Sequence, residues 1–224
     1  MISECPRKNI KVMVMVSTVE DAIEVVKSDP DIIVAQGSEA GGHRSTWVKK
    51  PSKEYASIGT LALVSQIVKR IKIPVVAAGG ITDGTGMIGA LSLGAEGVLM
   101  GTRFIATEES VAPECYKQKI IQESSDNTTV TDVFTGMYAR VIRNAFTENY
   151  ASSQAPVLPP GRQYAATLDI TKVAAQQQNS DYYTLYAGQG VDNVREILPA
   201  KNVIQNTIAE ALSELERQKK RINK

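Results

Sequence analysis

The sequence predicts an α/β fold built on a parallel sheet, and three observations carry this prediction. Short apolar runs rich in Val and Ile recur in the first half of the chain, helical patterns separate them, and a glycine or small polar residue ends each run. This alternation is typical of β-α-β units, whose strands pair in parallel. We therefore expect parallel strands with helices packed over them.

Four segments are predicted to form the strands of this sheet. Each is short and continuously apolar rather than alternating, as strands buried on both faces are. They are Ile10–Val16, Asp31–Gly37, Ile73–Gly80 and Glu96–Thr102.

Capping signals and apolar faces predict the helices between these strands. Ser17–Glu20 has the pattern of a capping box at the start of the first helix. An apolar face predicts the second helix within Ile58–Ile71, and Thr82-Asp83 can cap a third. Near the C-terminus, Val203–Arg217 predicts an amphipathic helix that packs back on the first half through Val203, Ile204, Ile208, Leu212 and Leu215.

The second half of the chain has a different character. Its pattern is irregular from Ala112 to Gly190, it holds most of the aromatic residues, and it has a proline-rich break at Pro156–Gly161. These features predict a smaller, mainly helical subdomain. The expected organisation is a partial β/α unit over 1–110, a helical subdomain over 111–190 and a returning helix over 191–224.

Composition excludes several classes of function. A net charge of +1 and the lack of a basic run interleaved with aromatics argue against nucleic-acid binding. The apolar runs are too short for a membrane span, and the N-terminus does not have the pattern of a signal peptide. Cys5 and Cys115 form no disulfide pattern, so we expect a soluble, cytoplasmic protein, and one histidine cannot assemble a zinc site with them.

The run Val34–Ser45 is the strongest candidate for chemistry. A buried strand leads into Gly41 and Gly42 and then into His43, the single histidine of the chain. Loops that follow parallel strands form the ligand-binding face, paired glycines allow close backbone approach, and histidine suits proton transfer near neutral pH. The alternative is a tight turn followed by an exposed loop histidine; the position just after a strand favours function. Trp47 is expected to pack in the same loop.

Two glycine turns form the second candidate feature. Ala77–Gly84 follows one predicted strand and Met100–Phe104 follows the next, with Gly80 and Gly101 twenty-one positions apart. In β/α barrels, phosphate groups are held by backbone N–H groups after two consecutive strands, and no basic side chain is required. The alternative for either turn alone is close packing of helix on sheet.

Together, these motifs resemble those of the nitronate monooxygenases. The resemblance rests on QGSEAGGHRS and AAGGITDGTGMIGALSLGAEGVLMGTRF, followed by YARVIRN (Tyr138–Asn144) and YAGQG (Tyr186–Gly190) in the expected order. It extends from about Ile10 to about Gly190. Flavin-dependent enoyl-carrier-protein reductases share much of the same pattern.

The resemblance implies the C-terminal half of a TIM-type (β/α)8 barrel, about four βα units, with FMN bound at its mouth under a helical subdomain. His43 would be the catalytic residue, taking an α-proton from a nitroalkane or orienting a nitronate. The flavin would be reduced by the nitronate and reoxidised by O2, giving a carbonyl compound and nitrite. The implied FMN-binding residues are Gln36, Gly41 and Gly42 at the flavin, and Gly79, Gly80, Leu99, Met100, Gly101 and Thr102 at its phosphate.

One departure from the family pattern affects these expectations. Family members begin with roughly four more βα units, the number needed to complete a barrel, and this chain has none of them. We therefore expect weak or absent FMN binding by this chain alone, and completion by association, including homo-oligomerisation, stays open. An enoyl-thioester reductase and an inactive remnant of the fold are the alternatives to nitronate oxidation.

Overall fold

The protein divides into two compact units, each made of segments distant in sequence. The computed structural model describes residues 10–45 and 57–223, so Cys5 and Trp47 lie outside the described residues. The first unit comprises Met1–Glu39, Ser45–Met100 and Ile204–Lys224, and the second comprises Ala40–Arg44 and Gly101–Val203.

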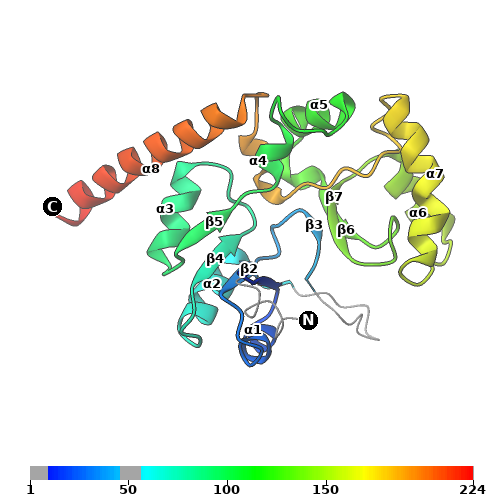
Figure 1. Ribbon diagram of the computed structural model, residues 1–224. Helices are drawn as coiled ribbons and strands as arrows, with labels where there is room; N and C mark the ends of the chain where they lie inside the picture. The colour runs from blue at the N-terminus through cyan, green and yellow to red at the C-terminus, as the bar shows by residue number, and fades with distance from the viewer. Residues whose placement is uncertain (1–9, 46–56, 224) are drawn as a thin grey trace. The chain divides into compact units, whose positions relative to one another are not determined.

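The first unit is built on a four-stranded parallel sheet with the order β1-β2-β4-β5 (Figure 1). The strands are β1 (Met13–Val16), β2 (Ile32–Gln36), β4 (Val75–Ala78) and β5 (Gly97–Leu99). Each lies within one of the four predicted segments, so the parallel α/β prediction is confirmed. That this sheet is half of a barrel stays a prediction.

Helices α1 (Val19–Val26), α2 (Thr60–Val68) and α3 (Gly84–Ser92) connect these strands. Asp83 caps α3 as predicted, since its Oδ1 accepts a hydrogen bond from Gly86 N at 2.7 Å. At α1 the cap is Thr18, one residue after the start of the predicted Ser17–Glu20 capping box, and its Oγ1 accepts a hydrogen bond from Asp21 N at 3.0 Å. Such bonds satisfy N–H groups that have no partner inside the helix.

The core of the first unit lies between the sheet and these helices. Both central strands are largely buried, whereas the outer strands are more exposed, with Met13 at 51% and Leu99 at 38% exposure. Fully buried side chains include Val16, Ala22, Ile33, Ala35, Leu63, Val64, Ile67 and Ala77.

The C-terminal helix α8 (Ala200–Ile222) is longer than predicted, and its packing face differs from the prediction. A Cβ added at Gly84 of α3 would lie 2.3 Å from both Ala211 N and Thr207 O, so the two helices are in close backbone contact. Thr207 and Ala211 are buried there because a small residue allows that approach. The large aliphatic side chains expected to pack inward are instead exposed: Ile204, Ile208, Leu212 and Leu215.

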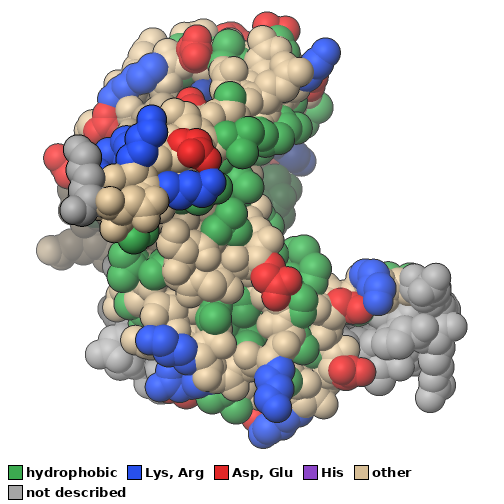
Figure 2. Space-filling view, turned by 90° about the vertical axis from the view of Figure 1, so that its left-hand side faces the viewer, with side chains coloured by type: hydrophobic (Ala, Val, Ile, Leu, Met, Phe, Trp, Pro, Cys, Tyr) green, Lys and Arg blue, Asp and Glu red, His purple; other side chains and the backbone are tan. Residues whose placement is uncertain are grey.

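Figure 2 is turned so that the C-terminal end of α8 faces the viewer, and it shows basic and acidic side chains close to that end. On this helix, ion pairs one turn apart join Arg217 to Glu214 and Lys219 to Glu216.

The second unit contains a sheet that the sequence did not predict. Strands β3 (Gly42–His43), β7 (Ala139–Ile142) and β6 (Thr128–Thr131) pair antiparallel in that order. All four residues of β7 are buried, including Arg140, which donates a hydrogen bond to Thr128 Oγ1 at 3.1 Å. Strand β7 is short and contains the charged Arg140, so it lacks the continuous apolar run from which the other strands were predicted.

Helices make up much of the rest of the second unit. They are α4 (Thr102–Ile105), α5 (Glu114–Gln122), α6 (Ala145–Ser153) and α7 (Arg162–Gln176), with 3₁₀ helices η3 (Ser125–Asn127) and η4 (Gln189–Asn193). One core cluster surrounds Ile120, Ile142 and Leu185, and a second contains the stacked rings of Phe134 and Phe146, whose centroids are 4.8 Å apart.

Across residues 10–45 and 57–223, no helix combines the length and the apolar character needed to cross a membrane.

Candidate functional site

The predicted site residues fall into two groups, one in each unit. Gln36, Gly79, Gly80, Leu99 and Met100 belong to the first unit, and Gly41, Gly42, His43, Gly101 and Thr102 belong to the second.

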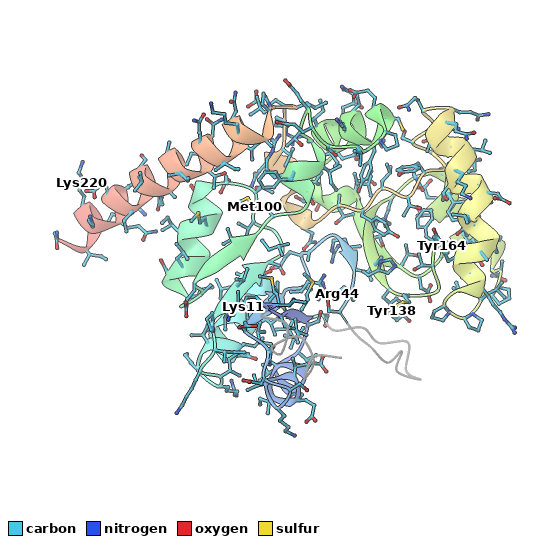
Figure 3. The ribbon with its side chains drawn as sticks, viewed as in Figure 1. Lys11, Arg44, Met100, Tyr138, Tyr164 and Lys220 are labelled. Carbon is cyan, nitrogen blue, oxygen red and sulfur yellow. The ribbon has the colours of Figure 1, made fainter. Side chains whose placement is uncertain are left out.

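The first group lies where the parallel strands end. Gln36 pairs with Ala78, and Ala78 pairs with Leu99, so β2, β4 and β5 end level with one another. Gly79 and Met100 therefore leave the sheet at its carboxyl edge, and Figure 3 labels Met100. This edge is where parallel α/β proteins bind ligands.

Gln36 is buried at this edge, with 4% of its surface exposed. Its Oε1 accepts hydrogen bonds from Ser17 Oγ at 2.9 Å and from Ser45 N at 3.0 Å. Gln36 therefore ties the end of β1 to the segment after β2. Because two donors already occupy Oε1, a hydrogen bond from Gln36 to a ligand would have to be donated by its amide nitrogen.

The turn after β4 presents backbone N–H groups. Gly79 and Gly80 have φ values of 116° and 71°, a region that favours glycine. Within the described part of the chain, the amides of Gly80 and Ile81 have no hydrogen-bond acceptor. Such N–H groups suit an anion, as the sequence predicted for this turn.

Glu39 lies beside this turn, and sequence analysis gave it no role. Its Oε2 accepts hydrogen bonds from Thr60 N at 2.8 Å and Thr60 Oγ1 at 2.9 Å. The residue at the start of α2, Gly59, has no side chain for capping, so the carboxylate of Glu39 serves the helix N-terminus instead. A Cβ added at Gly80 would lie 3.3 Å from the Cβ of Glu39, so the side-chain stem contacts the turn while the charge is held by α2.

In the second unit, the glycines before His43 allow close backbone packing. A Cβ added at Gly41 would lie 2.5 Å from Gly188 N, so only glycine fits there without displacement. Gly42 has a φ of 77°, again a conformation that favours glycine. The histidine loop therefore lies directly against the YAGQG segment.

Thr102 contacts the same segment, since its Oγ1 accepts a hydrogen bond from Gly188 N at 2.9 Å. The structure thus brings Gly41 and Thr102, 61 positions apart in the sequence, onto Gly188. No spacing rule in the sequence connects these three residues.

Gly101, directly before α4, is exposed, and a Cβ added there would meet no atom within 4 Å. In the residues that the structure describes, the amides of Gly101 and Thr102 have no hydrogen-bond acceptor. Helix α4 has only four residues, so these N–H groups, rather than a helix macrodipole, supply the local positive potential.

His43 lies on β3, opposite Ala139 of β7. Its Nε2 is 2.9 Å from Thr135 Oγ1, and its ring centroid is 5.4 Å from that of Tyr186. The side chain is exposed, yet the protein atoms around it remove part of its hydration, which lowers the pKa of His43. Burial also raises the pKa of Tyr186 to about 12, so this phenol is neutral at physiological pH.

Arg44 anchors the loop behind His43. Its side chain is 2% exposed, and its backbone N donates a hydrogen bond to Tyr138 O at 2.8 Å; Figure 3 labels both residues. Among the described residues, no group of three or more His, Cys, Asp or Glu side chains is placed so that it could hold a metal ion.

Comparison with known proteins identifies the family. The nitronate monooxygenase family model matches residues 1–210. The chain belongs to the nitronate monooxygenase family. Relatives within it include probable nitronate monooxygenases from Staphylococcus saprophyticus, 40% identical over 212 residues, and Staphylococcus haemolyticus, 42% identical over 173 residues.

The chain spans about half to three fifths of the length of these family members. The alignment covers 94% of this chain and 59% of the Staphylococcus saprophyticus protein, and 77% and 48% for the Staphylococcus haemolyticus protein.

Two solved structures resemble this fold over nearly its whole length. Nitroalkane oxidase from Streptomyces ansochromogenes aligns with a TM-score of 0.88 and 34% identity, covering 95% of this chain and 60% of that one. FabK from Thermotoga maritima aligns with a TM-score of 0.82 and 31% identity, covering 96% of this chain and 65% of that one.

Proposed function

We propose that this protein is an oxidoreductase that uses FMN to oxidise alkyl nitronates with O2, giving a carbonyl compound and nitrite. The observation that carries the proposal is the pair of glycine turns, at Gly80 and at Gly101, whose amides lack protein acceptors among the described residues. Membership of the nitronate monooxygenase family and the likeness to nitroalkane oxidase support the choice of chemistry.

The residues present fit the phosphate end of FMN. Gly80 and Gly101 are both exposed, and N–H groups at such turns bind phosphate without a basic side chain. An added Cβ at Gly101 would meet no protein atom, so the space beside this amide is open to a ligand. Gly79, Leu99, Met100 and Thr102 would complete the phosphate-binding turns.

Gln36, Gly41 and Gly42 would lie at the flavin. Once bound, FMN would supply the two-electron redox chemistry that no side chain of this protein can provide. The protein's own contribution is to position the substrate and to handle its proton.

His43 would take the α-proton of a nitroalkane or orient the nitronate anion. The lowered pKa keeps its imidazole neutral near pH 7, as a general base requires. In its neutral form the ring can accept a proton, and as an imidazolium it can then pair with the nitronate formed.

A turnover assay with added FMN tests this proposal. The purified chain, supplied with FMN and O2, should release nitrite from a nitronate. Omission of FMN should abolish the reaction, and so should its replacement by riboflavin, because riboflavin lacks the phosphate. The enoyl-thioester reductase alternative predicts instead that NAD(P)H bleaches the flavin anaerobically and that a nitronate does not. Bleaching by NAD(P)H alone would overturn the proposal.

A further inference from the structure

The start of α2 lies against the ends of two strands of the parallel sheet. A Cβ added at Gly37 would lie 2.0 Å from Thr60 Oγ1 and 2.4 Å from Thr60 Cα, so Thr60 is in direct contact with the residue that follows β2. Gly37 N in turn donates a hydrogen bond to Ala78 O at 2.9 Å, at the end of β4. These three residues belong to the first unit, and their contacts place Thr60 beside the turn after β4.

Thr60 is fixed in this position, and its hydroxyl has two acceptors within reach. Thr60 is 9% exposed, and its backbone N donates a hydrogen bond to Glu39 Oε2 at 2.8 Å. Its Oγ1 lies 2.9 Å from Glu39 Oε2 and 3.0 Å from Gly79 O. A hydroxyl has one hydrogen to donate, so the two oxygens share it.

The two acceptors depend on this hydroxyl to different degrees. Glu39 Oε2 also accepts a hydrogen bond from the backbone N–H of Thr60. Among the described residues, Gly79 O has no donor other than the Thr60 hydroxyl. Loss of the hydroxyl would therefore leave Glu39 bonded to α2 and would leave Gly79 O without a protein donor.

The bond to Gly79 O also sets the direction of the next amide. In a trans peptide the C=O and the following N–H point in opposite directions. The peptide between Gly79 and Gly80 is trans, and its oxygen faces Thr60, so the N–H of Gly80 faces away from the start of α2. This is one of the amides that have no acceptor in the part of the chain that the structure describes.

The same peptide would rotate easily if the bond were lost. Gly79 and Gly80 have φ values of 116° and 71°, and glycine adopts φ values of either sign, so no side chain resists a flip of the plane between them. The peptide bond one residue earlier is held by Gly37 N at Ala78 O. The Thr60 hydroxyl is the contact that selects one orientation of the Gly79–Gly80 peptide.

We propose that Thr60 is a positioning residue whose hydroxyl fixes the Gly79–Gly80 peptide so that the N–H of Gly80 is presented to the phosphate of FMN. The role in cofactor binding rests on the proposed function; the role in orienting the peptide does not. Sequence analysis gave Thr60 no role, because the hydroxyl and the carbonyl that it bonds are 19 positions apart.

NMR of the flavin-free protein tests the orientation of the peptide. The chain has two Gly-Gly pairs, Gly41–Gly42 and Gly79–Gly80, so labelling glycine at both its carbonyl carbon and its nitrogen selects these two peptide bonds. In Thr60→Val, which keeps the branched shape, the Gly79 carbonyl and Gly80 amide resonances should shift and broaden as the peptide exchanges between orientations. Thr60→Ser, which keeps the hydroxyl, should match the wild type. Unchanged Gly79–Gly80 resonances in Thr60→Val would overturn the proposal.

Two references show whether the change is specific. The Gly41–Gly42 pair belongs to the second unit and should give the same resonances in every variant. Thr207→Val is the matched control, since Thr207 is a threonine of the first unit with the same 9% exposure. It should leave the Gly79–Gly80 resonances in place; the same shift in Thr207→Val would contradict a specific role for Thr60.

Titrations with FMN and with riboflavin, which lacks the phosphate, test the role in cofactor binding. Thr60→Val should weaken FMN binding about tenfold or more, the contribution of one hydrogen bond to a charged group, and should leave riboflavin binding unchanged. Thr60→Ser and Thr207→Val should bind both as the wild type does. An equal loss of affinity for the two flavins in Thr60→Val would refute the link to the phosphate.

These titrations also separate this inference from the proposed function. If the wild-type protein binds FMN no more tightly than riboflavin, the proposed phosphate site is wrong. Resonances of Gly79–Gly80 that still respond to Thr60→Val would then support the orienting role of Thr60 on its own.

Discussion

A Cβ added at Gly41 would lie 2.5 Å from the backbone nitrogen of Gly188, so these two glycines bring the histidine loop and the YAGQG segment into direct backbone contact. His43 lies two residues after Gly41, on β3 of the antiparallel sheet. The geometry of His43 therefore depends on Gly41.

Replacement of Gly41 by Ala should destabilise the second unit, because the methyl group would collide with backbone rather than with a movable side chain. We expect a loss of about 1–3 kcal/mol of unfolding free energy, the usual range for overpacking. Urea denaturation followed by tyrosine fluorescence measures it. Gly101→Ala, where the added Cβ meets nothing, should unfold like the wild type; equal stability of the two variants would contradict the packing described here.

Removal of the His43 imidazole should abolish most turnover of a neutral nitroalkane. His43→Ala should lower kcat/KM by about 10²–10⁴-fold, the contribution typical of a general base. A preformed nitronate, which has already lost its proton, should be affected much less. Unchanged turnover of the nitroalkane would remove His43 from the mechanism.

The pH dependence of activity and stability should follow the lowered pKa of His43. The neutral base dominates above its pKa, so the acid limb of kcat/KM for a nitroalkane should have its midpoint below pH 6.5. Because the unfolded chain binds this proton more readily, stability from His43 is present above the unfolded value of about 6.5 and is lost as pH falls towards the folded value. An acid limb with a midpoint above pH 7 in the kinetic profile would contradict this sign.

The exposed aliphatic side chains of α8 and the open strands β1 and β5 should promote self-association. Ile208 and Leu212 are 50% and 61% exposed on the same helix face, and unpaired strand edges are recognised association sites. Light scattering at increasing concentration should show association that a double Ile208→Lys, Leu212→Lys variant reduces. Gln205→Lys, an exposed position on the same helix, is the control; equal association of all three proteins would refute the role of this face.

The parallel sheet could be predicted because each of its strands is a continuous apolar run followed by a turn residue, and both signals are local. The cap at Asp83 could be predicted for the same reason, whereas the capping box predicted from Ser17 begins one residue before the observed cap, Thr18. The antiparallel sheet could not, because β3 has two residues and β7 contains Arg140, whose burial depends on a partner in another strand.

The candidate site shows the same division. The glycine turns and His43 follow strands directly, so their position at a strand end could be expected. Glu39 with Thr60, Thr135 with His43, and Gly188 with both Gly41 and Thr102 are contacts over long sequence separations. The packing face of α8 was wrongly predicted because hydrophobicity does not distinguish an inward aliphatic face from a face of small residues that allows close approach to Gly84.

As purified, the chain should carry little flavin and should bind added FMN reversibly. The chain spans about 59% of the length of its Staphylococcus saprophyticus relative. Absorbance of the purified protein gives the flavin-to-protein ratio. A yellow monomer with a ratio near one would show that this expectation is wrong.

An FMN titration of three proteins tests most directly whether the glycine turns bind the cofactor's phosphate. We predict weak but saturable binding by the wild-type chain, weakened at least about tenfold, or 1.4 kcal/mol, in Gly101→Ala, whose methyl group would enter the open space beside the amide. Gly89→Ala, an exposed helical glycine whose added Cβ also meets nothing, should bind as the wild type does. The same FMN affinity in all three proteins would contradict the account.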